Sequence, residues 1–288
     1  MATPTATLVT ATRARACLGA KGPDAESYLD KMLSNDLAAV PVRGSCDALL
    51  LTAKARVIAP VRVVRRAVDD FLLLTEPGLG AELGRQLLRA RFAAKVEIAE
   101  EPGHTVTLVL GDGWAPPAGT VAAACADFGV PGWELVDAAA PADAAPVAAD
   151  ELERLRIRAR TARFGLEIDD RVMPAEAGLV ESTVSFTKGC YPGQEPVARL
   201  HYRGHANRGL RALVLEGGGA GPGALPAYDT PVVHEGKEVG RVTSSVADGV
   251  GEGALPGAVF VLAYVRAEVP EDAPLEVAGA SARQLARP

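Results

Sequence analysis

The stretch from Phe186 to Arg199 gathers an unusual number of side chains that could take part in chemistry. Lys188 lies two residues before Cys190. A nearby cation favours the thiolate, which is the form of cysteine that acts as a nucleophile or a metal ligand. Gly189 and Gly193 permit a turn in which the backbone comes close to a ligand. We therefore expect Cys190 to be reactive and Lys188 to activate it.

The other three cysteines have a simpler interpretation. Cys17, Cys46 and Cys125 are scattered along the chain, and most free cysteines behave as small buried hydrophobes. The same interpretation stays open for Cys190. No pair of cysteines has the Cys-x-x-Cys spacing of a zinc or cluster site, so we predict no resident metal.

The composition limits the class of protein. The chain of 288 residues is 48% hydrophobic and 23% charged, which is typical of a folded protein with roughly two packed units. Its net charge of −6 argues against a surface built throughout to bind nucleic acid or anionic lipid. No apolar run approaches the ~20 residues that cross a bilayer, and no signal-peptide core precedes the first helix pattern. We expect a cytoplasmic, monomeric protein that does not bind membranes.

The first part of the chain has the element order of an α+β protein. A helix capped by Asp24 opens it. The apolar runs between 48 and 74 predict a meander of antiparallel strands, and leucines at helical spacing predict a helix over about 79–92. Strand patterns return at 95–98 and 105–110.

The second part of the chain has a different composition and a different pattern of elements. The stretch 116–146 is rich in Ala, Pro and Gly and indicates a loosely specified connecting region, in which we predict no chemistry. A helix is expected from Val147. Later, short β segments alternate with Gly and Pro, and Glu235-Gly236 has the form of a hairpin turn. We predict an α+β body over 1–207, either one unit or two interleaved subdomains, and a β-barrel over 208–288.

Four motifs carry a resemblance to a known family. The most specific is Lys188-Gly189-Cys190-Tyr191-x-Gly193-Gln194-Glu195, and the others are Arg163-Phe164-Gly165, Pro174-x-Glu176-Ala177-Gly178-Leu179 and Gly240-Arg241-Val242-Thr243-Ser244. With these motifs the sequence resembles the YgfZ-type folate-binding proteins, relatives of the glycine-cleavage aminomethyltransferase (T-protein). The resemblance covers nearly the whole chain and is weakest over 116–146.

The resemblance implies an aminomethyltransferase-like folate-binding α+β body with a C-terminal antiparallel β-barrel. It also implies a tetrahydrofolate site in the middle of the protein and a role in making or maintaining iron–sulfur enzymes. Glu176 matches the T-protein glutamate expected to accept the two parallel N–H donors of a pterin; without the resemblance it reads as an exposed loop carboxylate. Folate binding is further expected of the motif residues Tyr191, Gly193, Gln194, Glu195 and Arg199.

The folate tail is anionic, and arginines near the site would suit it. Positions 186 to 211 hold an excess of cations, namely Lys188, Arg199, Arg203, Arg208 and Arg211 against Glu195. Of the arginines, Arg199 belongs to the motif. The other three are not assigned to the folate individually, because solvated arginines of loops and strands would give the same sequence pattern.

The sequence also departs from its relatives. Ala59 and Pro60 stand where T-proteins carry paired aspartates, one of which is the catalytic group beside the folate nitrogens. A methyl group or a pyrrolidine ring cannot move a proton, so aminomethyl transfer is in doubt. Arg158 and Arg160 replace a Glu and a Gly that many relatives carry before Arg163.

The leading hypothesis is a folate-dependent accessory protein that assists the assembly, maintenance or repair of iron–sulfur enzymes. Tetrahydrofolate binds a central pocket, and Cys190 faces its mouth and meets a client or assembly protein. A single thiolate supplies too few ligands to hold a cluster alone, so the contact is transient. The alternative is a tetrahydrofolate-dependent aminomethyltransferase or demethylase.

Two further hypotheses belong to other classes. A cysteine-nucleophile or redox enzyme without folate would pair Cys190 with a histidine, and His201 and His205 follow it in the sequence. RNA binding through the basic stretch 199–211 has little support, because the net charge is negative and Tyr202 alone is a poor stacking platform.

Overall fold

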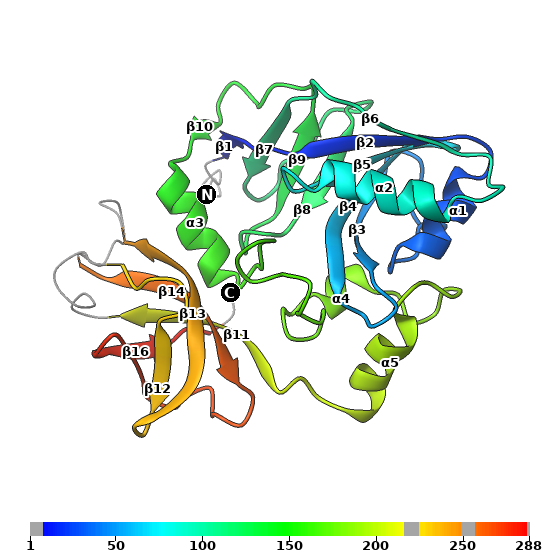
Figure 1. Ribbon diagram of the computed structural model, residues 1–288. Coiled ribbons are helices and arrows are strands. Elements are labelled where there is room, and N and C mark those ends of the chain that lie inside the picture. The colour runs from blue at the N-terminus through cyan, green and yellow to red at the C-terminus, as the bar shows by residue number, and fades with distance from the viewer. Residues whose placement is uncertain (1–7, 216–224, 249–256, 287–288) are drawn as a thin grey trace.

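The computed structural model describes residues 8–215, 225–248 and 257–286, which form two five-stranded sheets and a closed six-stranded barrel. In Figure 1 the barrel lies at the lower left, the first sheet at the right, and the second sheet above and between them. The predicted α+β body with a C-terminal antiparallel barrel is confirmed.

The first sheet has the strand order β3-β4-β5-β2-β6. Its strands are β2 (Ala16–Lys21), β3 (Ser45–Leu51), β4 (Val57–Ala67), β5 (Asp70–Thr75) and β6 (Glu97–Glu100). Helices α1 (Ala25–Met32) and α2 (Gly80–Ala90) cover one face, where Leu29 and Leu83 pack on Phe71 and other alternate strand residues. The predicted meander and the predicted second helix are thus both present.

The start of α1 differs from the prediction in one detail. Asp24 does precede the helix, but its carboxylate makes no hydrogen bond to the first turn. Instead Asp24 Oδ2 accepts a hydrogen bond from the backbone N–H of Lys95 at 2.7 Å. Asp24 therefore joins the helix start to the segment before β6 rather than capping the helix.

The second sheet has the order β10-β1-β7-β9-β8 and packs on the other face of the first sheet, where Leu72 and Leu74 meet Val106 and Val136. Its strands are β1 (Val9–Thr12), β7 (Val106–Leu110), β8 (Ala122–Cys125), β9 (Gly132–Val136) and β10 (Ala145–Pro146). The prediction of a loosely specified connecting region over 116–146 was wrong, because three of these strands lie in it. Ala123 fits the close contact between the sheets, whereas Ala122 packs against Val109 and Leu135 of its own sheet, and both small residues give little strand signal in the sequence.

The barrel follows the order β11-β14-β13-β12-β15-β16. Its strands are β11 (Arg208–Leu215), β12 (Pro231–His234), β13 (Lys237–Ala247), β14 (Val259–Arg266), β15 (Leu275–Val277) and β16 (Ala280–Gln284). Glu235 and Gly236, with φ of 50° and 75°, form the predicted hairpin turn between β12 and β13. Sequence patterns anticipated every barrel strand but the short, polar β16.

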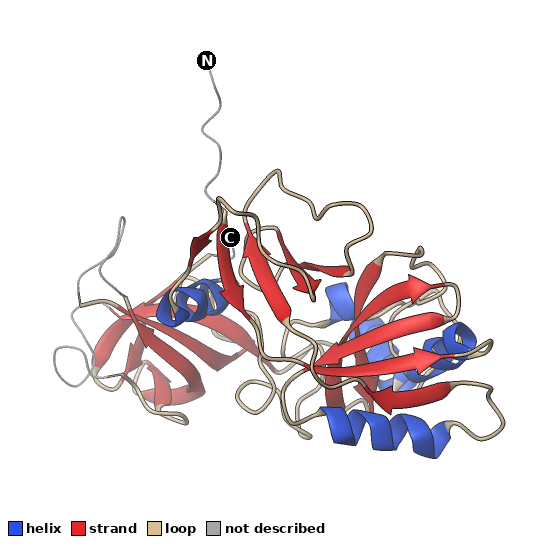
Figure 2. Ribbon diagram, turned by 90° about the horizontal axis from the view of Figure 1, so that it is seen from above, coloured by secondary structure: helices blue, strands red, loops and turns tan. Residues whose placement is uncertain are grey.

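Helix α3 (Ala149–Arg158) packs against β13 and β14 and, seen from above in Figure 2, lies in front of the barrel. The chain then runs through the short helix α4 (Val180–Thr183) and helix α5 (Gln194–Arg203) before it enters the barrel. Among the described helices, none has the length and apolar character needed to span a bilayer.

Polar contacts at one end of the first sheet join it to the second sheet. Glu101 accepts hydrogen bonds from Arg66 at 2.7 and 3.0 Å. His104 contacts Glu101 at 3.2 Å and also Asp137, which follows β9, at 2.6 Å. The hydrogen bonds from Arg66 outweigh the opposing effect of burial and lower the pKa of Glu101 from 4.5 to about 2.

Glu101→Gln is expected to reduce the free energy of unfolding by about 1 kcal/mol near neutral pH and by less in acid. A carboxylate with a lowered pKa contributes stability that is fully present above its unfolded pKa of 4.5 and is lost as the pH falls through about 2. Urea unfolding at pH 7 and pH 3 measures the difference, with the exposed Glu97→Gln as control. An effect of equal size at both pH values contradicts this prediction.

Candidate functional site

A cavity of about 1070 Å³ lies where the two sheets, helix α3 and the segments 161–165 and 177–183 come together. Its apolar wall includes Leu49, Leu79 and Phe164, and its polar wall holds arginines and carboxylates from both sheets. Pockets for small molecules commonly span about 300–1000 Å³ and combine an apolar lining with a few polar groups. The cavity is therefore large enough for an extended ligand.

Three arginines and two carboxylates form a polar cluster between the sheets, and Arg13, Arg15, Arg62 and Asp127 of this cluster line the cavity. Glu134 of β9 is fully buried, and its carboxylate lies 2.8 Å from Arg13, 2.8 Å from Arg15 and 3.1 Å from Arg62. Asp127 contacts Arg13 at 2.6 Å and Arg62 at 3.0 Å. Burial alone would raise the pKa of both carboxyl groups, but the guanidinium charges hold both pKa values below their ordinary range.

The same cluster has a geometry that could suggest a metal site. Cys125, Asp127 and Glu134 bring one potential ligand atom each to within 4.8 Å of one another. However, Arg13 donates to Asp127 at 2.6 Å and to Cys125 Sγ at 3.7 Å, and Glu134 is bound by three arginines. A cation here would face those guanidinium groups, so we assign no metal to the cluster.

A second buried carboxylate, next in the chain to the cavity-lining Ile168, joins two of the sequence motifs. The buried carboxylate of Glu167 accepts hydrogen bonds from Arg156 at 3.0 Å, from the Arg163 N–H at 3.0 Å and from Ser244 at 2.6 Å. Tyr264 of the barrel donates its hydroxyl to the Glu167 carbonyl at 2.8 Å. The segment after Arg163-Phe164-Gly165 and the barrel motif that ends in Ser244 thus meet at one carboxylate.

The residues around this motif also account for a departure from the relatives. Arg160 has a φ of 58°, in the left-handed region that glycine adopts most readily. Its guanidinium binds the Leu285 carbonyl at 2.7 Å. Arg160 thus holds the conformation that suits a glycine and adds a contact to the chain end that follows the barrel.

The position of the aminomethyltransferase aspartates is apolar on both faces of β4. Ala59 is fully buried in the core beneath α1 and α2, and Pro60 lines the cavity. Neither side chain titrates. The cavity wall therefore presents the pyrrolidine ring of Pro60 at a position where the resemblance to T-proteins implies a carboxylate.

Glu176 lies in the turn beside the cavity. Its neighbours Ala177 and Gly178 line the cavity, whereas the Glu176 carboxylate is mostly buried outside that lining. Glu176 Oε2 accepts a hydrogen bond from the Met173 N–H at 2.9 Å, and Oε1 accepts one from Arg208 at 2.9 Å. Glu176 is thus a partnered, partly buried carboxylate rather than an exposed loop residue.

Lys188 is anchored to the end of α1. Its side chain is only 2% exposed, and Nζ lies 2.9 Å from the Asp30 carboxylate. The ammonium group also donates hydrogen bonds to the carbonyls of Asp30, Leu33 at 3.0 Å and Asn35 at 2.6 Å. These contacts bind the motif loop to α1, and the geometry gives no support to Lys188 as the group that activates Cys190.

Tyr191 and Gly193 fix the same loop from the other side. Tyr191 is buried, and burial raises its pKa to about 12; its hydroxyl has no hydrogen-bond partner among the described residues. Gly193 has a φ of 83°, and a Cβ there would lie 2.6 Å from the Thr52 carbonyl. The glycine therefore permits α5 to start against the β3–β4 turn.

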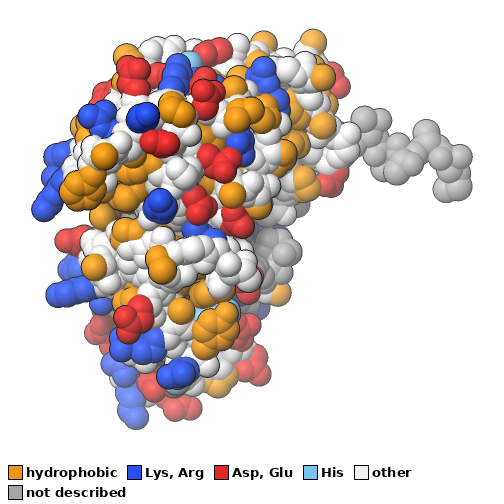
Figure 3. All heavy atoms as spheres, turned by 90° about the vertical axis from the view of Figure 1, so that its right-hand side faces the viewer, with side chains coloured by type: hydrophobic (Ala, Val, Ile, Leu, Met, Phe, Trp, Pro, Cys, Tyr) orange, Lys and Arg blue, Asp and Glu red, His pale blue; other side chains and the backbone are white. Residues whose placement is uncertain are grey.

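The remaining motif residues lie on or beside α5. Cys190 and the first-turn residue Glu195 are exposed, as is Arg199, which forms no ion pair among the described residues. Gln194 begins the helix, and its N–H binds the Tyr191 carbonyl at 3.3 Å. Figure 3 shows this side of the molecule, with basic and acidic side chains interspersed rather than gathered into a field of one sign.

The motif and the cavity occupy separate places. Residues 188–199 are absent from the described residues that line the cavity. The expectation that Cys190 faces the cavity mouth thus finds no support, and the folate roles predicted for Tyr191, Gly193, Gln194, Glu195 and Arg199 stay predictions.

Sequence reasoning missed Asp127 and Glu134, because it predicted no chemistry in 116–146. One signal was available: Glu134 interrupts the apolar run Trp133-Glu134-Leu135-Val136. A carboxylate inside an apolar strand is rarely fully buried unless it has a partner. That pattern predicts a cationic partner nearby, although it does not say which residue supplies it.

The comparisons with known proteins agree with the fold. A scan against models of protein families gives no match. The chain is 28% identical to the tRNA-modifying protein YgfZ of Edwardsiella ictaluri, over 93% of this chain and 87% of that protein. It is 26% identical to the iron-sulfur cluster assembly factor IBA57 homolog of Pyricularia oryzae, over 81% of this chain and 65% of that protein.

A solved structure shows the same architecture. The glycine cleavage system aminomethyltransferase T of Bartonella henselae superposes with a TM-score of 0.77 at 16% identity, covering 98% of this chain and 86% of that chain. The aminomethyltransferase-like fold is therefore confirmed, and so is the resemblance to the YgfZ-type proteins.

Glu134→Gln is expected to lower the free energy of unfolding by about 3 kcal/mol, because it leaves three arginines without their shared buried counter-charge. Urea unfolding at pH 7 measures the loss. The exposed Glu100→Gln serves as control and should change stability by less than about 0.5 kcal/mol. A loss as small as that of the control shows that the cluster does not hold the sheets together.

Cys190 is expected to be the cysteine alkylated first by iodoacetamide at pH 7.5. Burial raises the pKa of Cys46 to about 12 and that of Cys125 to about 11, and Cys17 is buried with a raised pKa, whereas Cys190 is exposed. Peptide mass spectrometry of the native protein identifies the modified residue, and Cys190→Ser is expected to remove the early labelling. Faster labelling of Cys46 contradicts the prediction.

Proposed function

We propose that this protein binds tetrahydrofolate in its central cavity and assists the assembly, maintenance or repair of iron–sulfur enzymes through Cys190. The observation that carries the proposal is the pairing of a large cavity, whose wall has Pro60 in place of a catalytic carboxylate, with an exposed cysteine outside it. The carboxylates that do line the cavity, among them Asp47, Asp127 and Glu153, are paired with arginines, which suits ligand binding by an accessory protein better than proton transfer in a transferase.

The cavity fits a folate in size and in chemistry. Its volume of about 1070 Å³ exceeds what one extended small molecule needs. Phe164 offers an aromatic ring to a flat heterocycle, and the partly exposed Arg163 offers a cation to a carboxylate tail. Glu176 stands beside the lining and supplies a carboxylate for paired N–H donors.

The thiol serves a partner protein in this proposal. Iron–sulfur clusters are held by several thiolates, and Cys190 is the exposed member of the four cysteines. A client or assembly protein would therefore supply the remaining ligands, and the complex would be short-lived. The similarity to YgfZ and to an IBA57 homolog, which is named as an iron-sulfur cluster assembly factor, supports a role in iron–sulfur protein assembly.

The alternative function is a tetrahydrofolate-dependent aminomethyltransferase or demethylase. The shared fold with aminomethyltransferase T favours it, whereas the apolar Ala59 and Pro60 oppose it. A cytoplasmic location and a monomeric state remain our expectations for either function.

Glu176→Gln is expected to weaken tetrahydrofolate binding about tenfold, because an amide cannot accept two parallel N–H donors. Isothermal titration calorimetry under anaerobic conditions measures the affinity. Glu181→Gln, which removes an exposed acid of α4, is the matched control and should leave the affinity unchanged. Unchanged affinity in Glu176→Gln rules out this residue as the pterin acceptor.

The two functions are separated by Cys190→Ser. The accessory function predicts that this variant keeps its tetrahydrofolate affinity but no longer supports cluster transfer to an apo iron–sulfur enzyme. The recovery of that enzyme's activity measures the transfer. A transferase predicts tetrahydrofolate-dependent turnover of an aminomethyl or methyl donor that survives Cys190→Ser. Such turnover would falsify the accessory function.

A further inference from the structure

Both oxygens of the Glu176 carboxylate are engaged by the protein itself. Oε2 accepts the Met173 N–H at 2.9 Å, and Oε1 accepts the Arg208 Nε–H at 2.9 Å. Recognition of a pterin by one carboxylate requires both oxygens to accept parallel donors from the ligand. In this geometry at least one of the two internal partners has to leave before a pterin can bind.

Arg208 is the partner that can leave. Met173 donates from the backbone of a turn, whereas Arg208 reaches Glu176 with a side chain that is 34% exposed. An ion pair that is partly in solvent stabilises a protein only modestly, so a ligand with two good donors can displace it.

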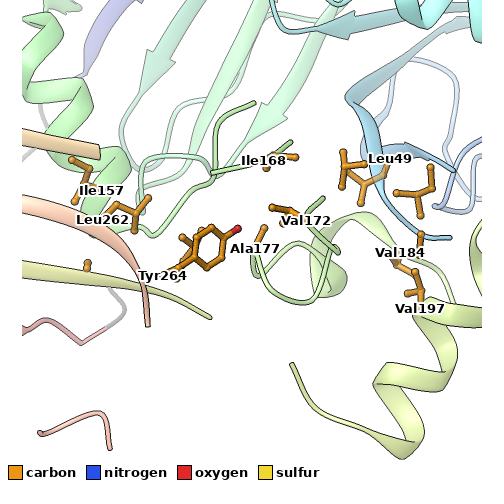
Figure 4. Packing of buried hydrophobic residues seen from close by; sticks show 14 of the residues in the cluster. Leu49, Ile157, Ile168, Val172, Ala177, Val184, Val197, Leu262 and Tyr264 are labelled. Atoms are coloured by element: carbon orange, nitrogen blue, oxygen red, sulfur yellow. The ribbon is translucent and has the colours of Figure 1, made fainter. Parts of the chain in front are cut away.

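The barrel holds Arg208 in this position. Arg208 is the first residue of β11, and its guanidinium lies 4.6 Å from the centre of the Tyr264 ring. The Tyr264 hydroxyl binds the Glu167 carbonyl at 2.8 Å, which fixes the ring. Figure 4 shows Tyr264 beside Ala177, the residue that follows Glu176 and lines the cavity.

We infer that Arg208 is an internal competitor for the folate site: it pairs with Glu176, turns the carboxylate toward the barrel, and has to be displaced when a pterin binds. This inference rests on the proposed function. The apparent affinity for tetrahydrofolate is reduced by the fraction of molecules in which Arg208 occupies Glu176. Arg208 therefore acts as a positioning residue and sets the folate concentration at which the cavity fills.

The test is the affinity of Arg208 variants for tetrahydrofolate, measured by calorimetry under anaerobic conditions. Arg208→Met removes the competitor and is expected to tighten binding by about three- to tenfold. The same variant loses an ion pair and a stacking contact, so its melting temperature should fall slightly. Arg208→Lys keeps the positive charge and should restore an affinity close to that of the native protein.

A matched control and a double variant separate competition from a general effect on the fold. Arg241 also lies over the Tyr264 ring, at 5.8 Å, but pairs with Asp229 instead of Glu176. Arg241→Met should leave the affinity unchanged. In a Glu176→Gln background, Arg208→Met should bring no further gain, because it acts through the Glu176 carboxylate.

Two results would overturn the inference, and they differ from each other. If Glu176→Gln weakens binding but Arg208→Met leaves it equal or weaker, Arg208 is not a competitor, while the folate site of the proposed function stands. If neither the native protein nor Arg208→Met binds tetrahydrofolate, the proposed function fails and the inference fails with it.

Discussion

The buried carboxylate of Glu134 decides how the two sheets meet. A fully buried charge costs several kcal/mol unless it has partners, and here three arginines surround it. Arg62 comes from the first sheet, and Arg13 and Arg15 come from the link between β1 and β2, where the chain crosses from the second sheet to the first. Because Glu134 and the three arginines stabilise one another, the β1–β2 link, the contact between the sheets and the arginines of the cavity wall depend on a single cluster.

A second buried carboxylate has the same function between the body and the barrel. Glu167 collects hydrogen bonds from α3, from the loop after it and from β13. Around it, one continuous apolar cluster runs from Leu262 and Tyr264 of the barrel to Leu49 of the first sheet (Figure 4). The cavity therefore lies between two polar joints, each of which fails if one member is left unpaired. Arg163 and Ser244 of the sequence motifs thus have a structural role as hydrogen-bond donors to Glu167.

The sequence could predict most elements, because their residues alternate strongly between apolar and polar positions. The hairpins of the first sheet, helix α2 and the barrel follow from local periodicity alone. Strand β8 did not, since Ala122 and Ala123 carry too little side chain to mark a buried face. Strand β9 did not either, because the buried Glu134 interrupts its short apolar run. The role of Lys188 was equally hidden, because its carbonyl partners at Asp30, Leu33 and Asn35 are more than 150 positions away in the chain. Proximity in sequence to Cys190 therefore gave no information about the contacts that hold Lys188.

The separation of the cavity from Cys190 limits how folate could influence the thiol. Residues 188–199 are not among the described residues that line the cavity, so a group bound there does not meet the thiol directly. Packing connects the two places instead: Tyr191 and Val197 belong to the same buried cluster as Leu49, Ile168 and Ala177, which line the cavity. Protein interiors are densely packed and transmit small displacements. A folate effect on Cys190 would therefore have to be a shift in the position or mobility of the motif loop, carried through this cluster, and not a transfer of atoms from the folate to the sulfur.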